Sequence, residues 1–106
     1  MEKNVKIGIL LDIYGKLLTE KQYKLLDDYY NKDLSLSEIA ENEKITRQAV
    51  RDNLLKGENN LLEYDKKLKL LNTIKEIDEI KELVNSIESK DRKVIDKIIK
   101  KLDKLY

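Results

Sequence analysis

Apolar residues recur along the chain at intervals of three and four, the spacing that places side chains on one face of an α-helix. In residues 2–18 the set assigned to one such face is Val5, Ile9, Leu10, Ile13, Tyr14, Leu17 and Leu18. Similar helical segments are expected in 20–30, 36–40, 47–64, 68–87 and 94–105. We find no segment with the two-residue period of a strand, so the pattern predicts an all-α protein.

Capping residues, rather than proline, mark the starts of several of these helices, because the chain contains no proline. Thr19 with Gln22, and Ser35 with Glu38, have the spacing of a capping box, in which each side chain bonds the other residue's backbone N–H. Thr46 is the expected N-cap of the following helix. These residues predict helix starts near positions 20, 36 and 47.

The segment from Leu36 to Leu54 has the pattern of a helix-turn-helix motif. It comprises a short helix with Ile39 and Ala40, a polar turn at 41–44, the apolar Ile45, the capping Thr46, and a second helix with Val50 and Leu54. Such turns often contain glycine where this chain has Lys44, so a residue from Asn42 to Lys44 is expected to adopt a positive φ, which Asn tolerates best. The first turn of the second helix in such motifs enters the DNA major groove.

The C-terminal part of the chain carries two further apolar stripes. They consist of Leu68, Leu71, Ile74, Ile77, Ile80, Val84 and Ile87, and then of Val94, Ile95, Ile98, Ile99, Leu102 and Leu105. Asn85, Ser86 and Ser89 mark the interruption between them, and two helices joined by a short linker pair as an antiparallel hairpin. We therefore expect a helix-turn-helix domain in residues 1–66 and a helical extension in 67–106, packed on the first domain or on a second chain.

The composition excludes the commonest catalytic and metal-binding chemistry. The chain has 106 residues and contains neither His nor Cys, so a Ser–His–Asp triad, a Cys nucleophile and thiolate metal sites cannot be assembled. We expect no enzymatic activity, no cofactor and no metal site. The chain has no run of about 18 apolar residues, which would predict a membrane span, and we recognise no secretory signal. We therefore expect a cytoplasmic location.

The charge is balanced overall, with 22 basic and 21 acidic residues. Residues 1–64 contain 10 basic and 12 acidic residues, whereas 65–106 contain 12 and 9. The helix-turn-helix half thus lacks the general basic excess on which much phosphate affinity depends. A local patch is still expected, and its candidate nucleic-acid-binding residues are Lys44, Thr46, Arg47, Gln48, Arg51 and Lys56. Arg and Gln are residue types that read base edges; the alternative is that they are ordinary solvated positions.

Other side chains have a structural interpretation beside a functional one. We expect packing in the core rather than base stacking for four tyrosines, because the chain has no Phe or Trp: Tyr23, Tyr29, Tyr30 and Tyr64. Two Gly residues within the first helix, Gly8 and Gly15, are expected at close helix contacts. Asp27 and Asp28 are expected on a solvated face. Leu55 is expected to point away from the inner face of its helix, where it either contacts a partner or packs under the C-terminal hairpin.

Three stretches together resemble one known family. They are Leu-Leu-Asp-Ile-Tyr-Gly-Lys-Leu-Leu-Thr-Glu-Lys-Gln at 10–22, Ser-Leu-Ser-Glu-Ile-Ala-Glu at 35–41 and Thr-Arg-Gln-Ala-Val-Arg-Asp-Asn at 46–53. In this order they resemble the YlxM family of Gram-positive bacteria and mycoplasmas, over roughly residues 5–70. The resemblance implies a small all-α protein, similar to the fourth region of bacterial sigma factors. It also implies a gene beside those of the signal recognition particle GTPases, and a role as a component or regulator of that pathway.

Two function classes follow from the motif and the resemblance. The leading hypothesis is a regulator that binds DNA, or alternatively RNA, through the candidate residues. The second is an accessory subunit of the signal recognition particle that contacts its GTPase or its RNA. A homodimer formed through the apolar stripe at 68–87 is the alternative to burying that stripe within one chain.

Overall fold

The structure is a computed structural model that describes residues 2–88 and 92–105, and every regular element in these ranges is helical. The elements are α1 (Lys3–Tyr14), the 3₁₀ turn η1 (Gly15–Leu17), α2 (Glu20–Tyr30), α3 (Leu36–Glu43), α4 (Arg47–Leu68), α5 (Leu70–Asn85) and α6 (Arg92–Asp103). The helices form two compact units, one ending at Lys69 and the other beginning at Leu70. The predicted all-α fold is confirmed.

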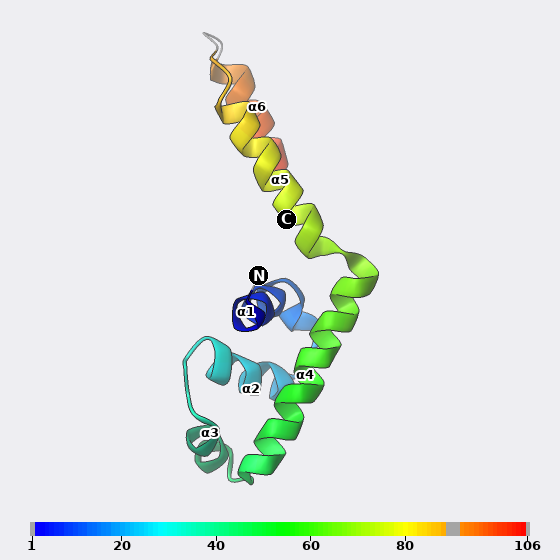
Figure 1. Ribbon diagram of the computed structural model, residues 1–106. Helices are drawn as coiled ribbons and strands as arrows, with labels where there is room; N and C mark the ends of the chain where they lie inside the picture. Colours follow the sequence, from blue (N-terminus) through cyan, green and yellow to red (C-terminus); the bar gives the residue numbers. More distant parts are fainter. Residues whose placement is uncertain (1, 89–91, 106) are drawn as a thin grey trace. The chain divides into compact units, whose positions relative to one another are not determined.

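The first unit is built around α4, and α1, α2 and α3 lie along one side of this helix (Figure 1). Its buried apolar side chains come from all four helices: Ile7, Leu10, Leu11, Tyr14, Leu25, Leu26, Ile39, Ala40, Val50, Leu54 and Leu61. The inner face of α4 is formed by Val50, Leu54, Gly57 and Leu61, as the spacing predicts. Each of the three shorter helices therefore buries its apolar face against the same long helix.

The buried face of α1 differs from the expected one. Ile7 and Leu11 are fully buried, whereas Val5 is 51% and Leu17 55% exposed. Nearly every second position of this segment is apolar, so spacing alone does not identify the inner face. Leu17 also lies beyond the end of α1, in η1, where the tighter 3₁₀ geometry changes the direction of the side chain.

The glycines have unequal roles. A Cβ on Gly57 would lie 2.7 Å from Leu26 Cδ1, so this residue permits the close approach of α2 to α4. A Cβ on Gly15 would meet the ring of Tyr23 at 2.7 Å, which fits the expected close contact. The expectation for Gly8 is wrong, because no side chain or other helix of the described residues comes within 4 Å of the position of its Cβ.

Two acidic side chains in the first unit are buried. Asp28 is 5% and Glu58 6% exposed, so the expectation that Asp28 lies on a solvated face is wrong. The hydroxyl of Tyr30 donates a hydrogen bond to Glu58 Oε1, and Lys3 Nζ lies 3.7 Å from Glu58 Oε2. Burial, followed by the hydrogen bond to Glu58, raises the pKa of Tyr30 above its ordinary value. The carboxylate of Glu58 is thus kept inside the protein by a neutral donor and a cation.

The tyrosines divide into packed and exposed side chains. Tyr29 and Tyr30 are half-buried and their rings meet edge to face, with centroids 5.0 Å apart. Tyr64 is also half-buried, and its ring lies 6.2 Å from that of Tyr14. Tyr23 is 42% exposed, so the core role expected for it is wrong. Its ring covers Gly15 from outside rather than filling the interior.

Helix α4 is longer than expected and ends where Lys69 adopts a left-handed backbone conformation (φ 55°). The second unit is an antiparallel hairpin of α5 and α6 (Figure 1). Leu71, Ile77 and Ile95 are buried, and Lys81 Nζ lies 2.6 Å from Asp103 Oδ1 across the pair. The expected break at 85–86 agrees with the end of α5 at Asn85, whereas Ser89 lies outside the described residues.

The unit boundary changes the apparent charge split. Up to Lys69 the sequence has 13 basic and 13 acidic residues, and from Leu70 onward it has 9 and 8. Most of the positive excess assigned to the C-terminal part therefore came from Lys66, Lys67 and Lys69, at and just after the end of α4. Within the hairpin the charges separate by helix, since α5 has two basic and four acidic residues and α6 has five and two.

Candidate nucleic-acid interface

The turn between α3 and α4 adopts a tight left-handed conformation at Lys44, which has φ 57°. The expected positive φ is therefore present, but on Lys44 rather than on Asn42. The backbone N–H of Ile45 donates to the carbonyl of Ala40 at 3.1 Å, and this bond closes the end of α3. This bond fixes Ile45 directly after the end of α3. The residue between Ile45 and the helix is Lys44, and it is therefore the one that adopts the left-handed conformation.

Side-chain caps determine where α3 and α4 begin. Ser35 Oγ accepts from the N–H of Glu38 at 3.1 Å, and Glu38 Oε1 accepts from the N–H of Ser35 at 3.2 Å, which completes the predicted capping box. Thr46 Oγ1 accepts from the N–H of Ala49 at 3.0 Å. At Thr19 the structure shows one half of the predicted box, a bond from the N–H of Gln22.

Three of the candidate residues lie together at the start of α4. Arg47, Gln48 and Arg51 are exposed, and with Leu36 of α3 they line a shallow pocket of about 330 Å³. Gln48 Nε2 donates to Asp52 Oδ1 at 2.9 Å, one turn further along the helix. The first two turns of α4 thus present two guanidinium groups and an oriented amide on one surface.

The other three candidates have different positions. Lys44 is exposed in the turn just before α4, and the hydroxyl of Thr46 is engaged in the cap. Lys56 is exposed but follows Arg47 by nine residues, which places it about 180° around the helix axis. Lys44 therefore lies next to the first turn of α4, whereas Lys56 lies on a different side of the helix from Arg47.

The charged groups of the candidate residues are not neutralised by an ion pair with the described residues. Within residues 2–88 and 92–105, the structure shows no ion pair closer than 4.0 Å for Lys44, Arg47, Arg51 or Lys56. By contrast, Lys24 Nζ of α2 lies 2.7 Å from Glu43 Oε1 of α3. The hydrogen bond to Glu43 raises the pKa of Lys24 above its ordinary value. That pair connects α2 to α3, the first helix of the motif, while the cations of α4 face solvent.

An apolar side chain adjoins this surface. Leu55 follows Arg51 by one turn and is 44% exposed, as the spacing predicts. Arg51 and Leu55 line a second pocket of about 240 Å³ together with residues of α1, α2 and α3. Sequence reasoning identified both residues but not this pocket, because its other walls come from distant segments.

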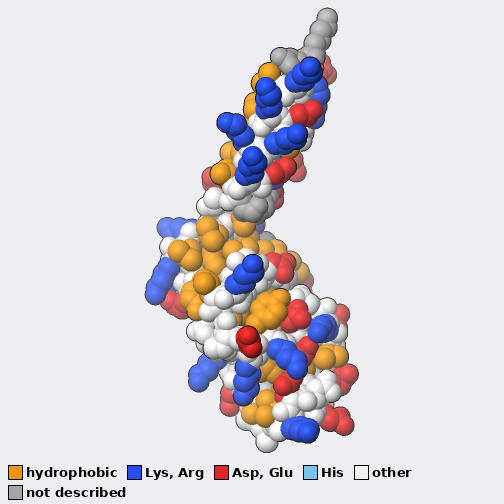
Figure 2. Space-filling model, turned by 180° about the vertical axis from the view of Figure 1, so that it is seen from behind, with side chains coloured by type: hydrophobic (Ala, Val, Ile, Leu, Met, Phe, Trp, Pro, Cys, Tyr) orange, Lys and Arg blue, Asp and Glu red, His pale blue; other side chains and the backbone are white. Residues whose placement is uncertain are grey.

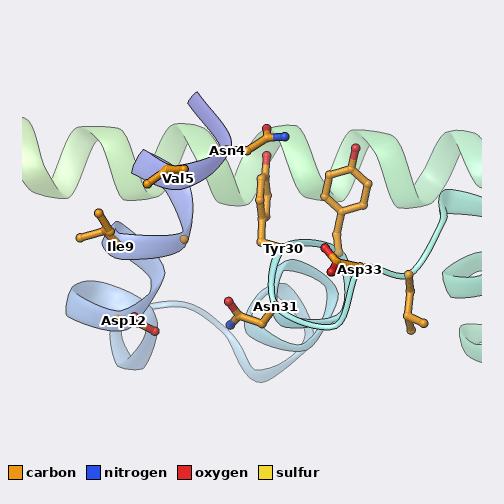
Figure 3. A pocket seen from close by; sticks show the side chains of 10 residues that line it. Asn4, Val5, Ile9, Asp12, Tyr30, Asn31 and Asp33 are labelled. Atoms are coloured by element: carbon orange, nitrogen blue, oxygen red, sulfur yellow. The ribbon is translucent and has the colours of Figure 1, made fainter. Parts of the chain in front are cut away.

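A larger groove lies between α1 and the end of α2. Its volume is about 510 Å³, and Figure 3 shows Val5, Ile9 and Asp12 on one side and Tyr30 on the other. Asn31 and Asp33 continue the second wall. The charged residues lining the groove are acidic, so it is unsuited to phosphate. Sequence reasoning missed this groove, since no local motif marks its two walls.

The short helix, the left-handed turn and the capped second helix define a helix-turn-helix protein. The part of the chain that the structure describes has no group of three acidic residues placed to hold a metal ion. It also has no helix long and apolar enough to cross a bilayer. Figure 2 shows basic and acidic side chains interspersed over the surface of the first unit, without a continuous basic face in that view.

The chain belongs to the family described as "Putative helix-turn-helix protein, YlxM / p13 like", whose sequence profile matches residues 1–102. It is 48% identical over 103 residues to a UPF0122 protein of Clostridium kluyveri, covering 92% of this chain and 93% of the relative. A UPF0122 protein of Fusobacterium nucleatum is 43% identical over 102 residues, covering 96% and 97%. One of Malacoplasma penetrans is 41% identical over 97 residues, covering 89% and 83%. The family is described by its helix-turn-helix and not by an enzymatic activity.

Proposed function

We propose that this protein is a regulator that binds duplex DNA with the first turn of α4 in the major groove. The carrying observation is that Arg47, Gln48 and Arg51 lie exposed side by side, and that neither guanidinium forms an ion pair with a residue in 2–88 or 92–105. Two Arg and one Gln can form bidentate hydrogen bonds to guanine and adenine edges. We expect Lys44, which is exposed in the preceding turn, to contact the phosphate backbone, while Thr46 acts through the cap.

The small net charge of the first unit sets the expected strength of binding. With 13 basic and 13 acidic residues up to Lys69, the unit has little general attraction for DNA. Affinity then depends on a few local cations, so we expect a shallow dependence on salt. Lys56 lies away from Arg47 around the helix, and we expect it to contribute less than either Arg.

Fluorescence anisotropy with the duplex from upstream of the chain's own operon tests this proposal. The variant Arg47→Ala/Arg51→Ala is expected to bind at least about tenfold more weakly, since each base contact is worth ~1–3 kcal/mol. The matched control is Lys16→Ala/Lys21→Ala, which removes the same charge from exposed positions in η1 and α2. Equal weakening by both pairs would reduce the effect to net charge and would contradict the named site.

The finer role that we propose is regulation within the signal recognition particle pathway, as the resemblance to the YlxM family implies. An accessory subunit that contacts the particle GTPase or its RNA is the second candidate. The exposed Leu55 beside Arg51 favours it, because mixed apolar and cationic surfaces are common where proteins meet. Pull-down with purified GTPase and particle RNA separates the two, since retention of neither component removes the second candidate.

A homodimer, which the sequence leaves open as the alternative to burying the stripe at 68–87 within one chain, is a separate proposal that does not depend on the ligand. Dimers of helix-turn-helix proteins place two recognition helices one turn of DNA apart and read two half-sites. Such an assembly needs a contact surface outside the exposed first turn of α4.

A further inference from the structure

The hairpin exposes more apolar surface than its own packing covers. Ile80 and Leu83 of α5 are 45% and 67% exposed, and Ile98 of α6 is 40% exposed. Ile87 and Leu105, just beyond the ends of these helices, are 54% and 64% exposed. Single exposed apolar residues are normal, but a contiguous group marks an interaction surface.

Helical geometry places these side chains on one face of the hairpin. On α5, Leu83 lies roughly 120° from the buried Ile77 around the axis, and on α6, Ile98 lies roughly 60° from the buried Ile95 in the same rotational sense. Because the two helices run antiparallel, offsets of the same sense fall on the same side of the pair. Figure 2 shows orange side chains along one edge of the hairpin, in agreement with this placement.

The apolar face has borders of opposite charge. The α5 border carries the exposed Glu79, and the α6 border carries the exposed Lys97 and Lys101. Glu76 lies roughly 100° from Ile77 in the same rotational sense, so around the α5 axis it falls between Ile80 and Leu83. This follows from the separation of charge between the two helices, in which α5 is acidic and α6 is basic. An occupant that fits the face must therefore present a basic edge to α5 and an acidic edge to α6.

We propose that the occupant is a second copy of this hairpin, which meets both requirements. A two-fold axis parallel to the helices places α5 of one copy on α6 of the other, so that each acidic border meets a basic border. A two-fold axis across the helices would place α5 on α5 and bring like charges together. The product is an antiparallel four-helix bundle in which each helix neighbours helices of opposite direction.

The size of the face sets the expected affinity. Sixteen residues of α5 span about 24 Å, and two helices are about 20 Å wide, so two copies bury on the order of 1,000 Å². This is the lower end of the range for specific interfaces. We therefore expect a dimer that dissociates at micromolar concentrations rather than an obligate one.

Sedimentation equilibrium of the full chain from about 1 μM to about 1 mM tests the surface. Leu83→Glu and Ile98→Glu are each expected to weaken dimerisation at least about tenfold, because each buries a charge in the apolar contact. Leu55→Glu is the matched control, since it makes the same change at an exposed position of α4 and should leave dimerisation unchanged. A wild-type chain that is monomeric throughout this range would overturn the proposal.

A charge exchange tests the orientation of the two copies. The Lys81–Asp103 pair fixes the register of the hairpin and places Glu79 of one copy near Lys101 of the other. Glu79→Lys and Lys101→Glu should each weaken dimerisation, and Glu79→Lys/Lys101→Glu should restore it, while circular dichroism verifies that helicity is retained. Additive weakening in the double variant would contradict the proposed arrangement.

Discussion

The four-helix unit and the hairpin carry similar amphipathic stripes, yet they bury them to different extents. Among the described residues, the unit of α1–α4 buries eleven apolar side chains, whereas α5 and α6 bury three. The reason is the number of neighbours, because α4 is packed by three helices and each hairpin helix by one. A two-helix seam covers only the residues at its centre, so the amphipathic helices of the hairpin keep an exposed apolar face, whereas those of the first unit enclose a core.

The largest expected effect comes from truncating matched leucines in the two units. Leu61 of α4 is fully buried, so Leu61→Ala should lower the free energy of unfolding by about 2–5 kcal/mol. Leu83 of α5 is 67% exposed, and Leu83→Ala in the dilute monomer should change it by no more than about 0.5 kcal/mol. Urea denaturation followed by circular dichroism measures both, and similar losses would erase the distinction between the units.

A smaller effect is expected from the polar interior of the first unit. Tyr30→Phe removes the donor to the buried Glu58 and should cost about 1–3 kcal/mol, whereas Tyr23→Phe on the exposed side should be near neutral. Because the pKa of Tyr30 is raised in the folded state, its contribution is complete below pH about 10 and declines as the pH rises above that value.

The pH dependence gives this prediction its own control. Stability of the wild type, measured by thermal melts from neutral to alkaline pH, should fall above pH about 10. Tyr30→Phe should show a smaller alkaline decrease from a lower starting point, because it lacks the ionising phenol. If Tyr30→Phe loses as much stability at alkaline pH as the wild type, the loss comes from the ionisation of groups other than Tyr30.

The smallest expected effects come from two helical glycines with different surroundings. Gly8→Ala meets no atom within 4 Å and should stabilise the protein by up to about 1 kcal/mol through helix propensity. Gly57→Ala gains the same propensity but places a Cβ 2.7 Å from Leu26, so its net effect should be destabilising by about 1 kcal/mol. Thermal melts of both variants give the signs, and a stabilised Gly57→Ala would show that Leu26 can move away without cost.

Local chemistry made much of the fold predictable. The caps at Ser35 and Thr46 act within three residues of sequence, so their spacing was sufficient to locate the starts of α3 and α4. The helix-turn-helix and the grouping of Arg47, Gln48 and Arg51 follow from the same local periodicity. The left-handed residue of the turn was predicted to within three positions, but its assignment to Lys44 depends on the hydrogen bonds that close α3.

The sequence by itself determined the helices, their caps, the lack of His and Cys, and the segment that forms the helix-turn-helix. Tertiary structure decided which face of α1 is buried, that Tyr23 is exposed, and that Asp28 and Glu58 are buried. It also decided that Gly57, rather than Gly8, allows helices to approach closely. The physical reason is that periodicity and capping act within a few residues, whereas burial depends on neighbours supplied by distant parts of the chain.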